Sequence, residues 1–413
     1  MPTRHIAIIG GGAAGCFAAI NLRRMLPDAE VTVLESRNKP LAKVAVTGGG
    51  RCNITNSFKE VRSIASVYPR GERIMRRLLR EFSHEDTCRW FENEGVRLVT
   101  QADQCVFPTS QDAMEIVCTL TRLMRENGVR LRTGCRAERI ECAENGGFTI
   151  TCGEEKPLVI SADTVIVATG GFRKSDSTAM FGNMRIEMAE PVPSLFGLCL
   201  PEDSITGLTG IVVDNVSVGL AGTKHRATGP LLITHWGMSG PAILRLSSYA
   251  ARTLHENGYK AQLCVNWLGD LNENEAAGII ADMAAASPNR QLSTAHPPMI
   301  NSRLWQYLLL RCGLRTEQKW SATGKKTHNR IASALTGSIH NVDGKNRFKE
   351  EFVTCGGVAL SNVSQKTLEC RDYPGLFFAG EALDIDAVTG GFNLQAAWTT
   401  GYVAAKAAAK QHL

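Results

Sequence analysis

Three features are scarce in this 413-residue sequence: runs of basic residues, closely paired cysteines and long apolar stretches. The 46 basic and 40 acidic residues leave a net charge of only +6, spread along the chain, so we do not expect nucleic acid as a partner. No apolar stretch reaches the roughly 18–20 residues of a membrane-spanning helix. No signal-like segment opens the chain either, so we expect a cytoplasmic protein that does not bind a membrane.

The 13 cysteines include no C-x-x-C pair. This absence argues against a dithiol redox centre, and we predict buried thiols in a reducing cytosol and no metal site. The 39 glycines, by contrast, are many for this length, and they cluster in short groups. Such clusters indicate tight turns beside a ligand.

The order of strand-like and helix-like segments predicts an α/β protein with a discontinuous first domain. A short apolar strand (residues 5–10), an amphipathic helix (14–25) and a second strand (30–35) form a β-α-β unit. The sequence becomes β-rich near Pro191 and helical near Asn272, and strand character returns near Phe352. We therefore predict one domain at 1–190 plus 353–413, a β-rich inserted domain at 191–270 plus 337–352, and a small helical domain at 271–336.

Other segments follow the same rules. Asn272 and Glu275 have the spacing of a capping box, and Asn301 is placed to cap a further helix that stops at Gly313. The remaining expected elements are helices at 75–82, 113–126 and 393–410, strands at 129–142, 148–152, 163–171 and 374–381, and a glycine-rich loop at 47–56.

The first β-α-β unit carries a dinucleotide-binding fingerprint. Gly10, Gly12 and Gly15 form G-x-G-x-x-G directly after the strand, where they permit a tight turn, the approach of a pyrophosphate and close helix–strand packing. The helix N-terminus offers free N–H groups to phosphates. Glu35 ends the next strand about 20 residues later, where a ribose-binding carboxylate is expected. The alternative, an ordinary glycine-rich turn, accounts for neither the carboxylate nor the second strand.

Segments far along the chain favour FAD over NAD. Two apolar strands end in small residues at Ala168–Gly170 and at Gly380, and could lie against the cofactor. Gly390 and Gly391 then open a final helix, whose N-terminal dipole suits the N1–C2=O edge of a flavin. A plain NAD domain needs no such return of the chain. In the 47–56 loop, Arg51 and Asn53 could reach phosphate or ribitol groups, although a solvated arginine is the alternative.

Seven segments of the sequence together resemble a known family. The segments IAIIGGGAAG, TGGGRCNITN, VFPTSQDA, VIVATGG, THWGMSGPAIL, TCGGVAL and GLFFAGEALDIDAVTGGFNLQAAW resemble the BaiN/YhiN-like flavoprotein family, in order and over residues 4–405. The resemblance implies a Rossmann-type FAD-binding domain of the two-dinucleotide-binding type, with inserted β-barrel-like and small helical domains. It also implies FAD contacts at Lys43 and Ala137, which nothing else in the sequence suggests.

Together, the motifs and the resemblance predict FAD contacts at Gly10, Gly12, Ala13, Ala14, Gly15, Glu35, Ser36, Lys43, Gly48, Gly49, Gly50, Arg51, Cys52, Asn53, Ala137, Ala168, Thr169, Gly170, Gly380, Glu381, Gly390, Gly391, Phe392, Asn393 and Leu394. For Cys52, a buried structural thiol is the alternative reading.

The predicted activity is hydride transfer between flavin N5 and a small organic substrate, with NAD(P)H as transient reductant. The family resemblance suggests an unsaturated carbonyl compound as substrate. A single complete G-x-G-x-x-G indicates that NAD(P)H has no separate domain. His235 is the candidate general acid, because histidine titrates near neutral pH, with a surface or structural histidine as the alternative. A flavin-dependent RNA-modifying enzyme and a non-catalytic flavin sensor stay open as other functions.

Overall fold

The computed structural model describes residues 4–144, 146–153, 157–173, 179–346 and 353–412. The chain divides into two compact units, Met1–Val192 with Val353–Leu413, and Pro193–Phe352. The first unit is discontinuous, and each unit has its own sheet and apolar core. The finer division of the second unit into a β-rich and a helical domain stays a prediction.

A five-stranded parallel sheet forms the centre of the first unit. Its strands run in the order β19-β10-β1-β2-β6, and every neighbouring pair is parallel. The strands are β1 (His5–Ile9), β2 (Glu30–Leu34), β6 (Arg130–Arg132), β10 (Thr164–Val167) and β19 (Leu376–Phe378). Strands β10 and β19 are buried along their whole length, as expected for a sheet covered on both faces. The predicted Rossmann-type α/β fold is therefore confirmed.

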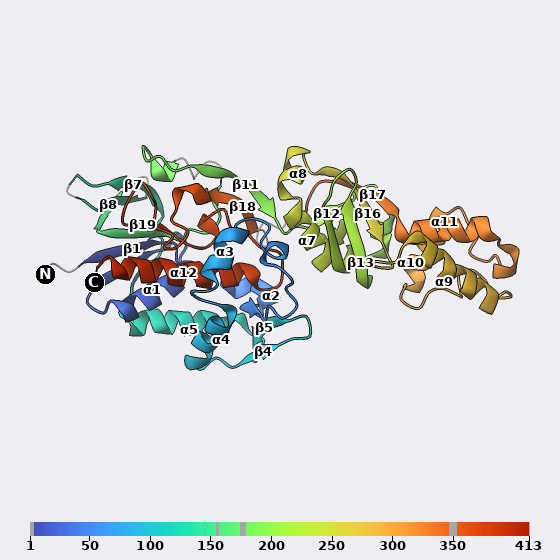
Figure 1. Cartoon of the computed structure of the whole chain (residues 1–413), viewed down its shortest axis with the longest axis horizontal. Helices are drawn as coiled ribbons and strands as arrows, with labels where there is room; N and C mark the ends of the chain where they lie inside the picture. The colour runs from blue at the N-terminus through green and yellow to red at the C-terminus, as the bar shows by residue number, and fades with distance from the viewer. Residues whose placement is uncertain (1–3, 145, 154–156, 174–178, 347–352, 413) are drawn as a thin grey trace. The chain divides into compact units, whose positions relative to one another are not determined.

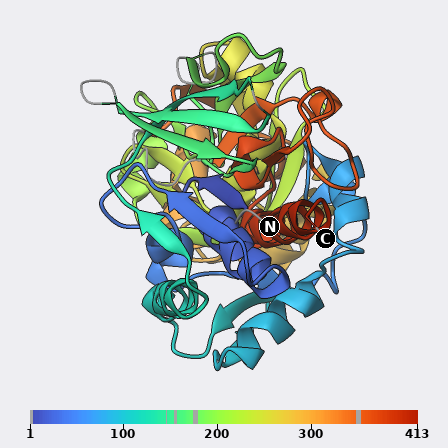
Figure 2. The same ribbon diagram turned by 90° about the vertical axis from the view of Figure 1, so that its left-hand side faces the viewer.

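The last helix of the chain packs on the first. Helix α1 (Ala13–Met25) follows β1, and α12 (Phe392–Lys410) lies alongside it in both Figure 1 and Figure 2. The two helices approach closely at Gly401, where an added Cβ would lie 2.6 Å from the carbonyl oxygen of Ala14. The C-terminal segment thus completes the domain that the N-terminal segment begins.

Smaller elements surround this layer. They are α2 (Thr47–Gly50), α3 (Glu72–Leu78), α4 (His84–Asn93), α5 (Ala113–Glu126), the antiparallel set β3 (Thr55–Asn56), β5 (Cys105–Pro108) and β4 (Leu98–Thr100), the antiparallel set β7 (Ala137–Cys142), β8 (Phe148–Cys152) and β9 (Leu158–Ala162), and the pair β11 (Met188–Ser194) and β18 (Val353–Val358).

One continuous strand at 129–142 was a wrong prediction. The segment splits into β6, which pairs with β2 in the parallel sheet, and β7, which pairs with β8 in a separate antiparallel sheet. Gly134 lies between them with φ +65°, a turn conformation that breaks the strand. Helix α4 and strand β9 were not predicted.

The second unit contains a six-stranded antiparallel sheet in the order β12-β15-β14-β13-β16-β17. Its strands are β12 (Leu198–Cys199), β13 (Val212–Leu220), β14 (Arg226–Thr234), β15 (Gly237–Ser239), β16 (Lys260–Asn266) and β17 (Ser338–Asp343). The N–H of Cys199 donates to the carbonyl of Gly344 at 3.0 Å, so the two edges of the sheet meet and it nearly closes into a barrel. The last residues predicted for the β-rich domain, 347–352, lie outside the described part of the chain.

Among its described residues, this unit also has five α-helices: α7 (Pro241–Tyr249), α8 (Ala251–Glu256), α9 (Glu273–Ala286), α10 (Ser302–Arg311) and α11 (Lys325–Thr336). The capping box is confirmed, because the Asn272 side chain accepts from the N–H of Glu275 and the Glu275 carboxylate accepts from the N–H of Asn272. Helices α7 and α8 interrupt the segment expected to be β-rich. In the part of the chain that is described, no helix has both the length and the apolarity to cross a membrane.

Candidate functional site

Three glycines shape the turn between β1 and α1. Gly10 has φ +109°, and a Cβ there would lie 2.2 Å from the carbonyl oxygen of Ala168. A Cβ on Gly15 would lie 1.9 Å from the carbonyl oxygen of Gly10. At Gly12, by contrast, a Cβ would meet no described atom within 4 Å. Two of the glycines are thus required by close packing, whereas the third borders open space at the start of α1.

Helix α1 begins with an unblocked N-terminus. Its cap residue, Gly12, provides no side-chain hydrogen bond, and the first turn holds no acidic residue. The N–H groups of Ala13, Ala14 and Gly15 therefore have no acidic competitor within the turn. An anion beside Gly12 would meet both these donors and the positive end of the helix dipole.

Glu35 is nearly buried, at 9% exposure, and is held by the backbone. One carboxylate oxygen accepts from the N–H of Gly11 at 2.8 Å and the other from the N–H of Arg37 at 2.7 Å. A carboxylate has about four acceptor positions, so this fixed group can still accept ribose hydroxyls. The N–H of Cys135 donates to the carbonyl of Glu35 at 2.8 Å, which brings the segment leading to Ala137 beside it.

A second cluster gathers around Glu381, just after β19. One Glu381 carboxylate oxygen lies 3.2 Å from Nζ of Lys43, and the other accepts from the N–H of Thr354 at 2.7 Å. A Cβ on Gly170 would lie 3.8 Å from Glu381 and 4.0 Å from Lys43. Lys43, which the family resemblance alone had suggested, thus lies beside the ends of β10 and β19.

The start of α12 is joined to the glycine-rich loop. The side-chain amide of Asn53 is oriented so that its oxygen faces a donor and its nitrogen faces an acceptor. The oxygen accepts from the N–H of Gly391 at 3.0 Å, and the nitrogen donates to the carbonyl of Thr55 at 2.8 Å. Gly391 has φ +89° and provides no side-chain cap to α12, whose first turn lacks acidic residues. The side-chain oxygen of Asn393 accepts from the N–H of Ala387, and its side-chain nitrogen donates to the carbonyl of Ala387, both at 2.9 Å. The side chains of Asn53 and Asn393 therefore fix the helix N-terminus, and direct contact with FAD stays a prediction for both.

The glycine-rich loop itself is a left-handed turn. Gly48, Gly49 and Gly50 all have positive φ, and the described residues leave open space beside the last two. Arg51 stacks on the ring of Phe107 at 4.5 Å. Burial raises the pKa of the fully enclosed Cys52 thiol to about 12, so this cysteine stays protonated near neutral pH.

The remaining predicted residues lie as follows. Ser36 is exposed beside Glu35, Ala168 is buried with Thr169 following it, Gly380 lies against Ala14, Gly390 adjoins Phe392, and Leu394 is half-buried in the first turn of α12. His235 lies in the second unit, exposed in the turn between β14 and β15, and no hydrogen bond to its ring is found among the described residues. Its catalytic role stays a prediction.

Two features of the first unit were missed from the sequence. Arg70 and Asp386 form a buried ion pair, with the Asp386 side chain fully enclosed. Burial lowers the pKa of Arg70 and the hydrogen bonds to Asp386 raise it, leaving it above its usual value. Helix α3 also presents several arginines on one face, although the chain has no long basic run. Their spacing of three and four residues was the signal that could have revealed them.

Comparison with known proteins identifies this arrangement. The family described as HI0933-like protein Rossmann domain matches residues 4–407. The chain belongs to the HI0933-like family. This confirms the resemblance to BaiN/YhiN-type flavoproteins, and the chain is an FAD-dependent oxidoreductase of that family.

Relatives extend over the whole chain. A 3-dehydro-bile acid delta(4,6)-reductase of Clostridium scindens is 29% identical, covering 98% of this chain and 99% of its own. A ribosomal RNA dihydrouridine synthase of Escherichia coli is 27% identical, covering 97% and 96%. Among solved structures, a 3-ketosteroid-delta4-(5alpha)-dehydrogenase from Rhodococcus jostii RHA1 matches 99% of this chain and 97% of its own, with a TM-score of 0.50 and 15% identity. The structural likeness supports the fold alone.

The first unit offers a site that fits FAD. Open space beside Gly12 and an unblocked α1 suit the pyrophosphate, and the fixed carboxylate of Glu35 suits the ribose. At the other end of the site, the unblocked N-terminus of α12 suits the anionic edge that a flavin acquires on reduction. Because Gly380 contacts Ala14, these two ends are parts of one compact structure.

Proposed function

We propose that this enzyme reduces a carbon–carbon double bond conjugated with a carbonyl group, with NAD(P)H as the electron source. The observation that carries the proposal is the pairing of the two unblocked helix N-termini, at Gly12 and Gly391, across the contact between Gly380 and Ala14. FAD held there would supply a hydride at its N5.

The names of two relatives support this substrate chemistry. In a 3-dehydro bile acid, the delta-4 double bond is conjugated with the carbonyl at carbon 3. In uridine, the double bond that becomes saturated in dihydrouridine is conjugated with a ring carbonyl. The two substrates differ in size and charge, yet both reactions saturate an unsaturated carbonyl system. We infer that what these relatives share is a substrate whose carbon–carbon double bond is conjugated with a carbonyl group.

The protein residues contribute orientation and charge. The α1 N-terminus and Glu35 would hold the nucleotide part of FAD, while Lys43 and Glu381 border the strand ends next to it. The dipole of α12 would stabilise negative charge at the flavin edge. His235 is our candidate for the group that protonates the α-carbon of the substrate after hydride addition.

The test is anaerobic rapid mixing of the FAD-bound protein, first with NADH or NADPH and then with cyclohex-2-enone. We expect the flavin absorbance to bleach with at least one nicotinamide and to return with the enone, but not with cyclohexanone, which lacks the double bond. A flavin that stays oxidised with both nicotinamides, or that cyclohexanone re-oxidises equally well, would contradict the proposal. His235→Asn should slow re-oxidation by the enone and leave bleaching unchanged.

The flavin-sensor alternative predicts a different result. A sensor would bind FAD and undergo reduction without sustained turnover of any enone. Repeated cycles of NAD(P)H consumption, counted against the amount of enzyme, distinguish the two functions.

A further inference from the structure

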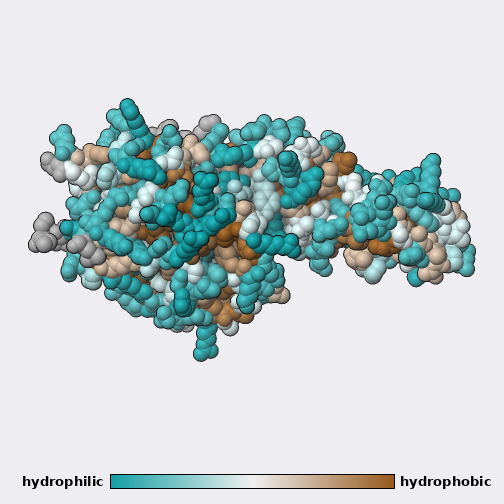
Figure 3. Space-filling model, viewed as in Figure 1, coloured by the Kyte–Doolittle hydropathy of each residue, from teal (hydrophilic) through white to brown (hydrophobic). Residues whose placement is uncertain are grey.

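Helix α3 has a buried side and a strongly basic side. Its inner side consists of Ile74, Met75 and Leu78, which are at most 1% exposed. Arg73 and Arg77, which we call the arginine pair, lie one turn apart on the outer side and are both exposed. Residues four positions apart are neighbours on a helix, so the two guanidinium groups can contact the same ligand. The surface around α3 is hydrophilic in Figure 3.

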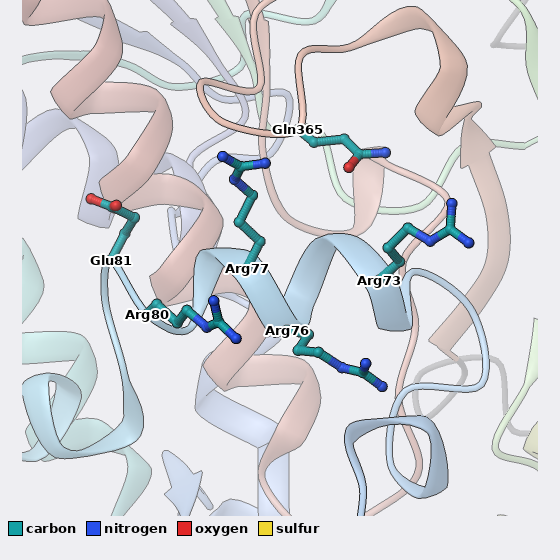
Figure 4. A pocket seen from close by; sticks show the side chains of 6 residues that line it. All are labelled: Arg73, Arg76, Arg77, Arg80, Glu81 and Gln365. Carbon is teal, nitrogen blue, oxygen red and sulfur yellow. The ribbon is translucent and has the colours of Figure 1, made fainter.

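The arginine pair lines an open pocket of about 480 Å³ within the first unit. The other residues that line this pocket are Arg76, Arg80, Glu81 and Gln365. Figure 4 shows Arg73 and Arg77 extending to the side of α3 on which Gln365 lies, whereas Arg76 extends to the opposite side. A cavity of this volume accommodates a small molecule or one end of a larger ligand.

The charge of the arginine pair is not neutralised within the described part of the protein. Arg76 pairs with Glu72, and the carboxylate of Glu81 lies 3.0 Å from Nζ of Lys406. The guanidinium groups of the arginine pair, by contrast, have neither a hydrogen bond nor an ion pair with any described residue. Like charges four residues apart destabilise a helix. This arrangement therefore weakens α3 but suits an anionic ligand.

The arginine pair lies close to the segment where the flavin edge is expected. Just before α3, the hydroxyl of Tyr68 donates to the carbonyl of Phe392, in the first turn of α12, at 2.8 Å. A Cβ on Gly71 would lie 2.7 Å from Ile385. Arg77 follows Gly71 by six residues. At a rise of 1.5 Å per residue, this separation is about 9 Å along the helix axis.

The proposed FAD site has no place for a second phosphorylated ribose. The carboxylate of Glu35, which the N–H groups of Gly11 and Arg37 hold in place, would repel a phosphate on the ribose 2′-oxygen. The sequence contains only one complete G-x-G-x-x-G. A nicotinamide dinucleotide therefore has to be bound by another surface. NADPH differs from NADH by a 2′-phosphate, and guanidinium groups bind phosphate oxygens through two parallel hydrogen bonds.

We propose that the arginine pair binds the 2′-phosphate of NADPH and so makes NADPH the preferred reductant. One helical turn separates the two arginines, about 6 Å along the axis, which matches a single phosphate group. A guanidinium plane also stacks on aromatic rings such as adenine, and the amide of the half-buried Gln365 can both donate to and accept from the edge of the base. This inference rests on the proposed function, because it names the source of the hydride.

Binding to the full-length, FAD-bound protein tests the inference without turnover. The probe is adenosine 2′,5′-bisphosphate, the adenosine end of NADPH, compared with adenosine 5′-phosphate by isothermal titration calorimetry at constant ionic strength. The test variant is Arg73→Gln/Arg77→Gln. The matched control is Arg97→Gln/Arg125→Gln, which removes the same charge from two exposed arginines of the same unit that lack described side-chain partners.

We expect the unsubstituted protein and the control to bind the bisphosphate roughly tenfold or more tightly than the monophosphate, because hydrogen bonds to a charged group are strong. In the test variant the two affinities should differ by no more than about twofold. Equal affinities in the unsubstituted protein, or an equal loss in both variants, would overturn the inference. Inorganic phosphate that competes as strongly as the bisphosphate would also overturn it, because the site would then be a general anion site.

Anaerobic rapid mixing separates a failure of this inference from a failure of the proposed function. The test variant should need more NADPH, but not more NADH, to bleach the flavin. If cyclohex-2-enone re-oxidises the flavin and both nicotinamides bleach it equally well in every variant, the proposed function stands and the inference fails. If bisphosphate binding depends on the arginine pair but the enone does not re-oxidise the flavin, the proposed function fails and the phosphate site stands. An unchanged urea midpoint shows that both variants are folded.

Discussion

Two neighbouring glycines in the first turn should respond to alanine in opposite ways. At Gly12 the added methyl group meets no described atom within 4 Å, and the backbone, with φ −86° and ψ −166°, is accessible to alanine. Alanine is a poorer N-cap than glycine by a few tenths to about 1 kcal/mol. Alanine also lowers the conformational entropy of the unfolded chain relative to glycine, which stabilises the folded protein by about 0.4–1 kcal/mol and offsets this loss. The free energy of unfolding without FAD should therefore change by less than about 1 kcal/mol.

At Gly15 the same methyl group would lie 1.9 Å from the carbonyl oxygen of Gly10 and 3.4 Å from the Ala168 side chain. Backbone at that distance must move, and overpacking of this kind costs about 1–3 kcal/mol. Gly15→Ala should therefore destabilise the protein even without cofactor. Gly12→Ala should instead lower the affinity for FAD by tenfold or more, about 1.4 kcal/mol, because the methyl group occupies the space assigned to the pyrophosphate.

The assay combines urea unfolding of the FAD-free protein with titration of FAD, followed by quenching of flavin fluorescence. The unsubstituted protein and Thr121→Ala, a change at an exposed position of α5 outside the predicted FAD contacts, provide the reference. If Gly12→Ala binds FAD as tightly as the unsubstituted protein, the pyrophosphate does not lie beside Gly12. If it unfolds as readily as Gly15→Ala, the open space is not present in solution.

Three further predictions concern other parts of the first unit. Asp386→Asn should lower the free energy of unfolding by about 3–5 kcal/mol in urea, because it leaves Arg70 charged and largely enclosed without its carboxylate; an unchanged midpoint would contradict this. At pH 8 iodoacetamide should label the exposed Cys118 and spare the native Cys52, as mass spectrometry of peptides can show; equal labelling would mean that Cys52 is accessible. Burial lowers the pKa of His84, so the unfolded chain binds the proton more readily. The stability that His84 contributes should be present above about pH 6.5 and lost as pH falls below it, and His84→Gln should flatten this dependence in thermal unfolding.

The sequence predicted the first β-α-β unit well because its signals are local. The glycine spacing, the apolar strand and the carboxylate of Glu35 lie within about 30 residues, and each has one physical reason to be there. The return of the chain at Gly390 and Gly391 was also predictable, since a glycine pair before a long apolar helix is a strong signal. These are the features that hold the two ends of the proposed FAD site.

Other features depend on contacts between residues far apart in the sequence, which local sequence patterns do not predict. The segment 129–142 has strand character throughout, but whether a strand joins the parallel or the antiparallel sheet is decided by residues far away. In THWGMSGPAIL, Pro241 is the first residue of α7, a position that tolerates its missing N–H, so the segment expected to be β-rich begins a helix there. The ion pair of Arg70 with Asp386 joins residues 316 positions apart, so only the fold could reveal it.

The close approach of Gly401 to Ala14 has a consequence for biosynthesis. While a ribosome is still making the inserted unit, the nascent chain already contains β1 and α1, but the helix that covers them has not been made. The apolar side of α1 therefore lacks its packing partner until α12 has been synthesised. The first of these two helices to be translated is therefore among the last elements to acquire its final neighbours.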